Sequence, residues 1–315
     1  MFPGFTDRDF DAYARNKWRS NAFNRERLEV KQKLGELGKS LTGQLRSEDG
    51  SPLLCEASAE HPALWNQKQV DSQQLFFSRN ESARRELDTI ITRGRSLASL
   101  IEDPSPQRSH VFLSIRLSVD QLVVGLRLHT DATVDRQNLT RKVAEQWLSD
   151  QFIDLLSTLD QSYVLSLGDT NHGSAKTLDA DALRLILVEL AEPLGPNQSR
   201  WLTIARTFDR AHTLAASETI SDDIRASLLA LLPVYQFVAW SRDNDHISIR
   251  DQLRQQTATK QKRGLAKNDK VRIVSGMFAG RNGVVHDVSD KGVLRVLVGN
   301  LPVVVKANEV EKQGQ

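Results

Sequence analysis

Two stretches in which apolar residues recur at every second position place the tightest limit on the fold of this chain. The apolar positions are Val111, Leu113, Ile115 and Leu117 in the first stretch, and Leu122, Val124, Leu126 and Leu128 in the second. Side chains of a strand alternate between its two faces, so each stretch predicts a strand with one apolar face. The short connection around Val119 and Asp120 predicts an antiparallel hairpin whose apolar face must be covered by other elements.

The residues around this hairpin predict the elements that cover it. Helical periodicity predicts helices at 25–41, 81–93 and 179–190, a long helix from Asp135 to about Leu156, and a last helix capped by Ser221. Pro233 is expected to kink or interrupt that last helix. Further strands are expected at 75–78, 162–167 and 200–208. Residues 1–250 therefore predict an α+β domain, a two-layer sandwich with an antiparallel sheet.

Length and composition restrict the class of protein. A chain of 315 residues with a formal charge of +2 is long enough for two domains and carries no global charge that would select a polyanionic partner. Its single cysteine, Cys55, excludes an internal disulfide framework. The beginning of the chain lacks the pattern of a secretory signal, and the most apolar run, 228–240, is too short to span a bilayer. We therefore expect a soluble cytoplasmic protein with no membrane partner.

The composition changes near residue 250. Residues 254–272 hold seven basic residues and one acid, and their first part lacks periodicity, which predicts a basic linker at 251–266. After it, short valine-rich stretches alternate with turns that contain Gly276, Gly280 and Gly283. Four short strands within about fifty residues, joined at glycine corners, are typical of a small SH3-like β-barrel, here at 267–315.

This passage resembles the KOW motif of NusG-like transcription factors and of several ribosomal proteins. The resemblance rests on Ser275-Gly276, Phe278-Ala279-Gly280 and Val284-Val285, with Gly283 in the place of the characteristic glycine of the motif. It implies contact with RNA, the ribosome or RNA polymerase, in some cases through a protein partner. The resemblance does not choose among these partners.

The residues of this module allow two kinds of contact. Its cations would bind phosphates of a nucleic acid: Lys267, Lys270, Arg272 and Arg281. Alternatively, Met277 and Phe278 would form an apolar tip for a protein partner. A third possibility is purely structural. In it, Phe278 closes the barrel, and the cations are surface residues that contact only water.

The N-terminal region is similar to uncharacterised bacterial families of the YktB-like kind. The similarity is carried by the opening Phe2-Pro-Gly-Phe-Thr-Asp-Arg-Asp-Phe and by Val124-Gly-Leu-Arg-Leu at the end of the hairpin. It implies an α+β fold and no activity.

The sequence shows no set of residues with the spacing of a known catalytic site. It also predicts no cofactor. The Gly-rich phosphate loops, the dinucleotide fingerprint and the nucleophile elbow are all absent. Weak candidates remain: a pair of His110 and His129, a cation site at Asp243, Asp245 and His246, a ligand loop at 168–174, and a basic-aromatic face of Phe76, Phe77, Arg84 and Arg85. For each of these, an ordinary structural role is the favoured interpretation, as it is for the Cys55 thiol.

These observations favour a non-catalytic binding protein of the transcription or translation machinery. Two other hypotheses stay open. In one, the N-terminal domain is an enzyme that the barrel directs to nucleic acid, and in the other it is a scaffold that binds another protein.

Overall fold

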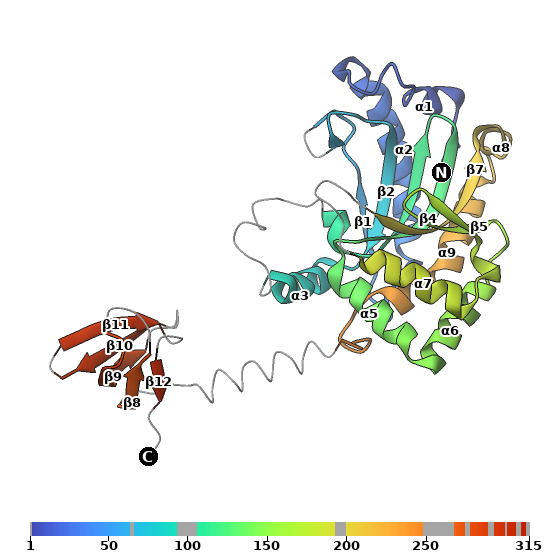
Figure 1. Ribbon diagram of the computed structural model, residues 1–315. Coiled ribbons are helices and arrows are strands. Elements are labelled where there is room, and N and C mark those ends of the chain that lie inside the picture. Colours follow the sequence, from blue (N-terminus) through green and yellow to red (C-terminus); the bar gives the residue numbers. More distant parts are fainter. Residues whose placement is uncertain are drawn as a thin grey trace. The chain divides into compact units, whose positions relative to one another are not determined.

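The chain divides into two compact units, Met1–Ile247 and Ser248–Gln315, which we call the large unit and the small unit (Figure 1). The computed structural model describes residues 2–63, 66–92, 106–192, 200–247, 268–274, 278–288, 293–299, 301–306 and 310–312. The linker predicted at 251–266 lies outside these residues. Among them, no helix combines the length and the apolar character that a membrane crossing requires.

A seven-stranded antiparallel sheet organises the large unit, and its strand order is β1-β2-β3-β4-β7-β5-β6. The strands are β1 (Leu54–Ala57), β2 (Ser72–Ser78), β3 (Phe112–Ser118), β4 (Gln121–His129), β5 (Tyr163–Leu167), β6 (Thr170–Ser174) and β7 (Trp201–Asp209). The predicted α+β class and antiparallel sheet are confirmed. The hairpin of β3 and β4 is confirmed as well, with Phe112 opposite Arg127 and Leu117 opposite Leu122.

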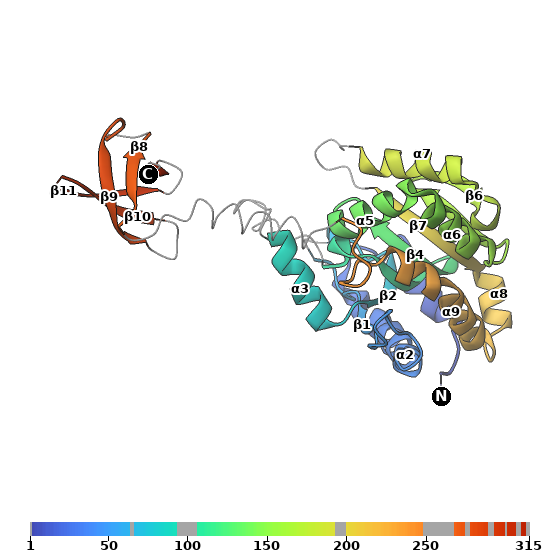
Figure 2. The same cartoon turned by 90° about the horizontal axis from the view of Figure 1, so that it is seen from below.

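The described helices of the large unit are α1 (Asp7–Asp11), α2 (Asn24–Thr42), α3 (Glu81–Thr92), α5 (Thr133–Ala144), α6 (Gln146–Ser157), α7 (Ala180–Ala191), α8 (Arg210–Ala215) and α9 (Ile220–Val238), with short 3-10 turns at Asn21–Phe23, Pro106–Ser109 and Ala175–Thr177. Helix α2 packs on β1 and β2, and α9 packs on β3 and β4, on the same side of the strands in Figure 2. Helices α5, α6 and α7 pack on one another, and α5 and α6 also contact α9.

The alternation of side chains along the strands divides the sheet into a core face, on which α2 and α9 pack, and an opposite face. We call the opposite face the uncovered face because neither of these two helices packs on it, although Phe112 and Ser114 on it are buried. The predicted apolar positions of β3 and β4 are fully buried in the main core, together with Leu75 and Phe77 of β2. The residues between them, such as Gln74, Phe76 and Arg127, therefore lie on the opposite face. This uncovered face carries the pocket described below.

The long helix predicted from Asp135 to Leu156 is wrong, because the structure has two helices in its place. Glu145 is extended at the junction of α5 and α6, with φ −89° and ψ 122°. The break lets both helices reach α9: Lys142 donates to the carbonyl oxygen of Phe237 at 2.9 Å, and Phe152 stacks on the Phe237 ring. Trp147, an aromatic residue within the range of the predicted long helix, lies beside the break and is 64% exposed.

Three other expectations are corrected by the structure. Helix α9 begins at Ile220, with Thr219 rather than Ser221 at its N-cap, and it continues without interruption past Pro233. Proline has no backbone N–H, so one carbonyl oxygen of the helix lacks its usual hydrogen-bond donor. Because Pro233 is exposed, this loss falls on the solvent side of α9, where a water molecule can donate to the oxygen instead. Residues 168–174, expected as a loop, contain β6 and form a tight hairpin with β5, in which Gly168 takes a φ of 58°.

A buried ion pair links four segments of the large unit. Asp135 is fully buried at the start of α5, and its carboxylate accepts a hydrogen bond from Arg79 Nη2 at 2.5 Å. The same carboxylate accepts the backbone N–H groups of Val111 and Trp240, each at 2.8 Å. Arg79 also contacts Nδ1 of His110 at 3.0 Å. Burial beside the Arg79 cation lowers the pKa of His110 to about 3, so this ring is neutral at physiological pH.

The small unit is a separate antiparallel sheet of five strands in the order β11-β10-β9-β8-β12. The strands are β8 (Lys270–Ile273), β9 (Asn282–Val288), β10 (Val293–Val298), β11 (Leu301–Lys306) and β12 (Val310–Lys312), one more than the sequence predicts. They enclose a core of their own, made of Val271, Ile273, Val285, Leu294, Val296, Val303, Val305 and Val310. Gly283 lies against β10, where an added Cβ would come within 2.5 Å of Val296 Cγ1 and 2.7 Å of the Leu297 carbonyl oxygen.

Two glycines of α2 provide a matched test of the packing of this helix on the sheet. A Cβ at Gly38 would lie 2.7 Å from both Cys55 Sγ and Leu75 Cδ2, whereas a Cβ at Gly35 would meet nothing within 4 Å. We expect Gly38→Ala to lower the free energy of unfolding by about 1–3 kcal/mol through overpacking. Gly35→Ala should raise it by roughly 0.5–1 kcal/mol, because alanine is the better helix former. Urea unfolding followed by tryptophan fluorescence measures both, and equal effects would contradict this packing.

Candidate functional site

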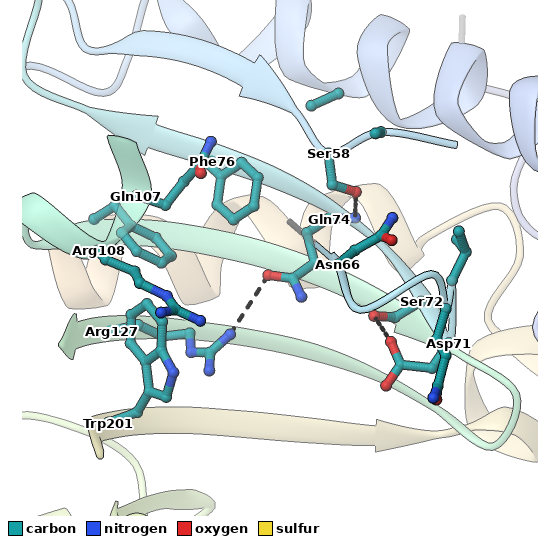
Figure 3. A pocket seen from close by; sticks show the side chains of 15 residues that line it. Ser58, Asn66, Asp71, Ser72, Gln74, Phe76, Gln107, Arg108, Arg127 and Trp201 are labelled. Carbon is teal, nitrogen blue, oxygen red and sulfur yellow. Dashed lines mark hydrogen bonds between the residues drawn. The ribbon is translucent and has the colours of Figure 1, made fainter. Parts of the chain in front are cut away.

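A pocket of about 540 Å³ opens on the uncovered face of the large sheet (Figure 3). Its floor comes from four neighbouring strands, β2, β3, β4 and β7. Its rim comes from the end of β1 and the residues after it, from the segment before β2, and from the 3-10 turn Pro106–Ser109. The side chains that matter for its chemistry are Gln69, Gln74, Phe76, Arg108, Phe112, Arg127 and Trp201. Ligand sites of proteins commonly have volumes of about 300–1,000 Å³, so this pocket is large enough for a small organic ligand.

Aromatic rings form one wall of the pocket. Phe76 of β2 meets Phe112 of β3 edge to face, with ring centroids 5.2 Å apart, and Phe112 meets Trp201 of β7 in the same manner at 5.7 Å. Phe112 is almost fully buried, whereas Trp201 is partly exposed. The pocket therefore presents an aromatic surface that does not belong to the main core.

Arg127 supplies a cation between these rings. Its guanidinium carbon lies 4.2 Å from the centroid of the Trp201 ring. Within the described part of the chain its one hydrogen bond runs from Nη1 to Oε1 of Gln74, at 3.4 Å, and it has no carboxylate partner. Burial, together with the neighbouring Arg116 cation, lowers the pKa of Arg127 to about 10, so it stays charged near neutral pH.

Two more polar side chains of the pocket have no partner among the described residues, namely the Arg108 guanidinium and the Gln69 amide. The acid that lines the pocket, Asp71, forms an ion pair at 3.3 Å with Arg116, which is not among the lining residues. The remaining charge of the lining is therefore positive. This arrangement favours an anionic ligand that also has an aromatic part and hydrogen-bonding groups.

The cations predicted from the sequence lie in the small unit. Lys270 and Arg272 are exposed on alternate positions of β8, and Arg281 is exposed just before β9. The Arg281 carbonyl oxygen accepts the N–H of Ile273 at 2.9 Å, which places Arg281 beside β8. None of the three forms an ion pair within the described segments of the small unit. Lys267 lies outside the described residues.

The predicted apolar tip is described only in part. Met277 lies outside the described residues. Phe278 is half-buried and packs against the core of the small unit. Its ring therefore contributes to the packing of the small unit, whatever else it contacts.

The other sequence candidates have ordinary partners. Arg84 pairs with Glu56 and Arg85 pairs with Glu81, while Phe77 is in the core and Phe76 lies on the uncovered face. Burial raises the pKa of the Cys55 thiol to about 11, which disfavours its reactive thiolate. In the described ranges, no three histidine, cysteine, aspartate or glutamate side chains form a group that would hold a metal ion.

Comparisons with known proteins add no family to this description. The sequence matches none of the protein-family models, and none of the curated proteins is similar to it.

Sequence reasoning missed the pocket. Arg127 lies at one of the positions between the apolar residues of its strand, where a charged side chain is ordinary and gives no sign of a site. The partners of Arg127 could not be read from the sequence, because Trp201 follows it by more than seventy residues and reaches it only through the pairing of β4 with β7.

Proposed function

We propose that the chain is a non-catalytic RNA-binding protein of the cytoplasmic transcription or translation machinery. In this proposal the small unit is an SH3-like barrel of the KOW type and contacts RNA, either free or within the ribosome or a transcribing RNA polymerase. The five short antiparallel strands with their own valine-rich core support a unit of this kind. The close approach of Gly283 to β10 supports the assignment of Gly283 as the glycine of the motif.

The observation that carries the proposal is a group of exposed cations that form no ion pair with any described residue. Lys270, Arg272 and Arg281 lie on or beside one strand, and the absence of ion pairs leaves their charges available for phosphates. Arg295 is also exposed, on β10, and extends the basic character to a second strand of the same sheet. Exposed Val284 and Val304 lie on this sheet too, so a bound strand would meet apolar as well as basic groups.

A salt series tests this proposal. If three phosphates of a single-stranded RNA are contacted, the logarithm of the association constant should fall against the logarithm of salt with a slope of about −2. The affinity should then fall roughly 20-fold between 50 and 200 mM salt. In the full chain with Lys270→Gln, Arg272→Gln and Arg281→Gln, we expect weak binding with a slope near zero. Fluorescence anisotropy of a labelled RNA measures both slopes.

A matched triple variant controls for net charge. Arg8→Gln, Arg25→Gln and Arg85→Gln remove three exposed cations from the large unit and should leave the slope unchanged. An equal loss in both triple variants would reject a specific contact by the small unit. A different result would be binding that does not depend on salt and that persists after Lys270, Arg272 and Arg281 are replaced. It would favour an apolar contact through Phe278 over a contact with phosphates.

A further inference from the structure

Arg127 of the large unit is a cation in a position that requires an anion. It is partly buried, it has no carboxylate partner in the described part of the chain, and its hydrogen bond to Gln74 is long and to a neutral group. A guanidinium in such a place is stabilised when a ligand supplies the missing negative charge. Its stacking on Trp201 occupies the face of the guanidinium plane, which leaves N–H groups at the edge free to donate.

The shape of that donor edge indicates a phosphate. An arginine fork binds two oxygens of a phosphate or carboxylate with parallel hydrogen bonds. Arg108, which lines the same pocket from the 3-10 turn, provides a second unpaired cation. Two cations suit a phosphate group, whose charge near neutral pH lies between one and two units.

The remainder of the pocket indicates an aromatic heterocycle. The partly exposed Trp201 ring and the edge of Phe76 offer apolar contact to a flat ring. The amide of Gln69, without a partner in the described segments, both donates and accepts hydrogen bonds, as the edge of a nucleobase requires. Figure 3 shows Gln74, Phe76, Arg108, Arg127 and Trp201 arranged around the same hollow.

We propose that this pocket binds one nucleotide, with Arg127 and Arg108 at its phosphate and the aromatic wall at its base. The nucleotide is either free or part of a single RNA strand. The inference goes beyond the proposed function, because it concerns a different unit and does not depend on the cations of the small unit.

Titration of the full chain with the four nucleoside monophosphates tests the inference. We expect at least one of them to bind and to change the tryptophan fluorescence, because Trp201 lines the pocket. Arg127→Gln should weaken this binding about 10-fold or more, since a charge-assisted hydrogen bond is lost. Arg108→Gln should weaken it several-fold, because the second cation of the pocket is lost. Arg225→Gln, at an exposed position of α9, is the matched control and should have no effect.

The same titration is repeated with inorganic phosphate and with short RNA oligonucleotides, which distinguish the possible ligands. A monophosphate should bind at least 10-fold more tightly than inorganic phosphate, because phosphate cannot use the aromatic wall. In the variant that lacks the three small-unit cations, tighter binding of a trinucleotide than of a monophosphate would identify an RNA strand as the source. Equal or weaker binding of the trinucleotide would identify a free nucleotide.

Three results would overturn the inference. They are no binding of any monophosphate, equal binding of inorganic phosphate, and unchanged affinity in both Arg127→Gln and Arg108→Gln. None of them bears on the salt dependence of the small unit, so failure of this site and failure of the proposed function are distinguishable.

Discussion

Replacement of Asp135 by asparagine is expected to lower the free energy of unfolding of the large unit by about 3–5 kcal/mol. The carboxylate is fully buried and accepts hydrogen bonds from Arg79 and from two backbone N–H groups. Asparagine removes the charge that balances buried Arg79 and turns one acceptor into a donor that faces other donors. The loss is a large part of the 5–15 kcal/mol that is typical of a folded domain.

Tryptophan fluorescence makes this measurement specific, because all five tryptophans belong to the large unit. Urea unfolding should show a clearly lower midpoint for Asp135→Asn than for the natural chain. The control is Asp222→Asn, which removes an exposed ion pair with Arg225 and should change the free energy of unfolding by no more than about 0.5 kcal/mol. Similar midpoints for both variants would show that the buried pair does not hold α5 to the sheet.

Replacement of Gly283 by valine is expected to unfold the small unit and leave the large unit intact. Its Cβ would lie 2.7 Å from a backbone oxygen of β10, and backbone cannot move aside as the end of a side chain can. A sheet of this size has only a few kcal/mol of stability to lose. Hydrogen exchange of peptides from 270–306 should become fast, while the fluorescence-detected unfolding of the large unit stays the same.

A second glycine of the same sheet is the control. Gly299 occupies the turn between β10 and β11 with a φ of 63°, and nothing lies within 4 Å of a Cβ there. Gly299→Asn should preserve the sheet, because asparagine tolerates this backbone conformation in hairpin turns. Slow exchange of the small unit in Gly283→Val would mean that β9 and β10 do not pack as described.

The sequence predicted those features that depend on local periodicity. The alternation in β3 and β4 identified the buried side of the hairpin, because strand parity is a local property. The break at Glu145 was not predictable, since no proline or glycine marks it and its cause is the contact of two helices with α9. The uninterrupted α9 shows the same limit: whether Pro233 breaks a helix depends on which side of the helix faces water.

The basic group of the small unit and the pocket of the large unit also differ in how far the sequence predicts them. The cations of the small unit are close in sequence, so their grouping followed from composition. The pocket combines residues of four strands whose order, β2-β3-β4-β7, includes a crossover, and it depends on long-range registers such as Arg127 opposite Thr203. The sequence alone does not show which residues of β4 and β7 lie opposite each other.

RNA binding by the small unit is tested most directly by a titration of the isotope-labelled full chain with single-stranded RNA, followed by its backbone amide NMR signals. We expect progressive shifts at Lys270, Arg272 and Arg281, with little change at α2 or α9. RNA that binds the chain without shifting any signal of β8 or of the start of β9 would contradict this expectation.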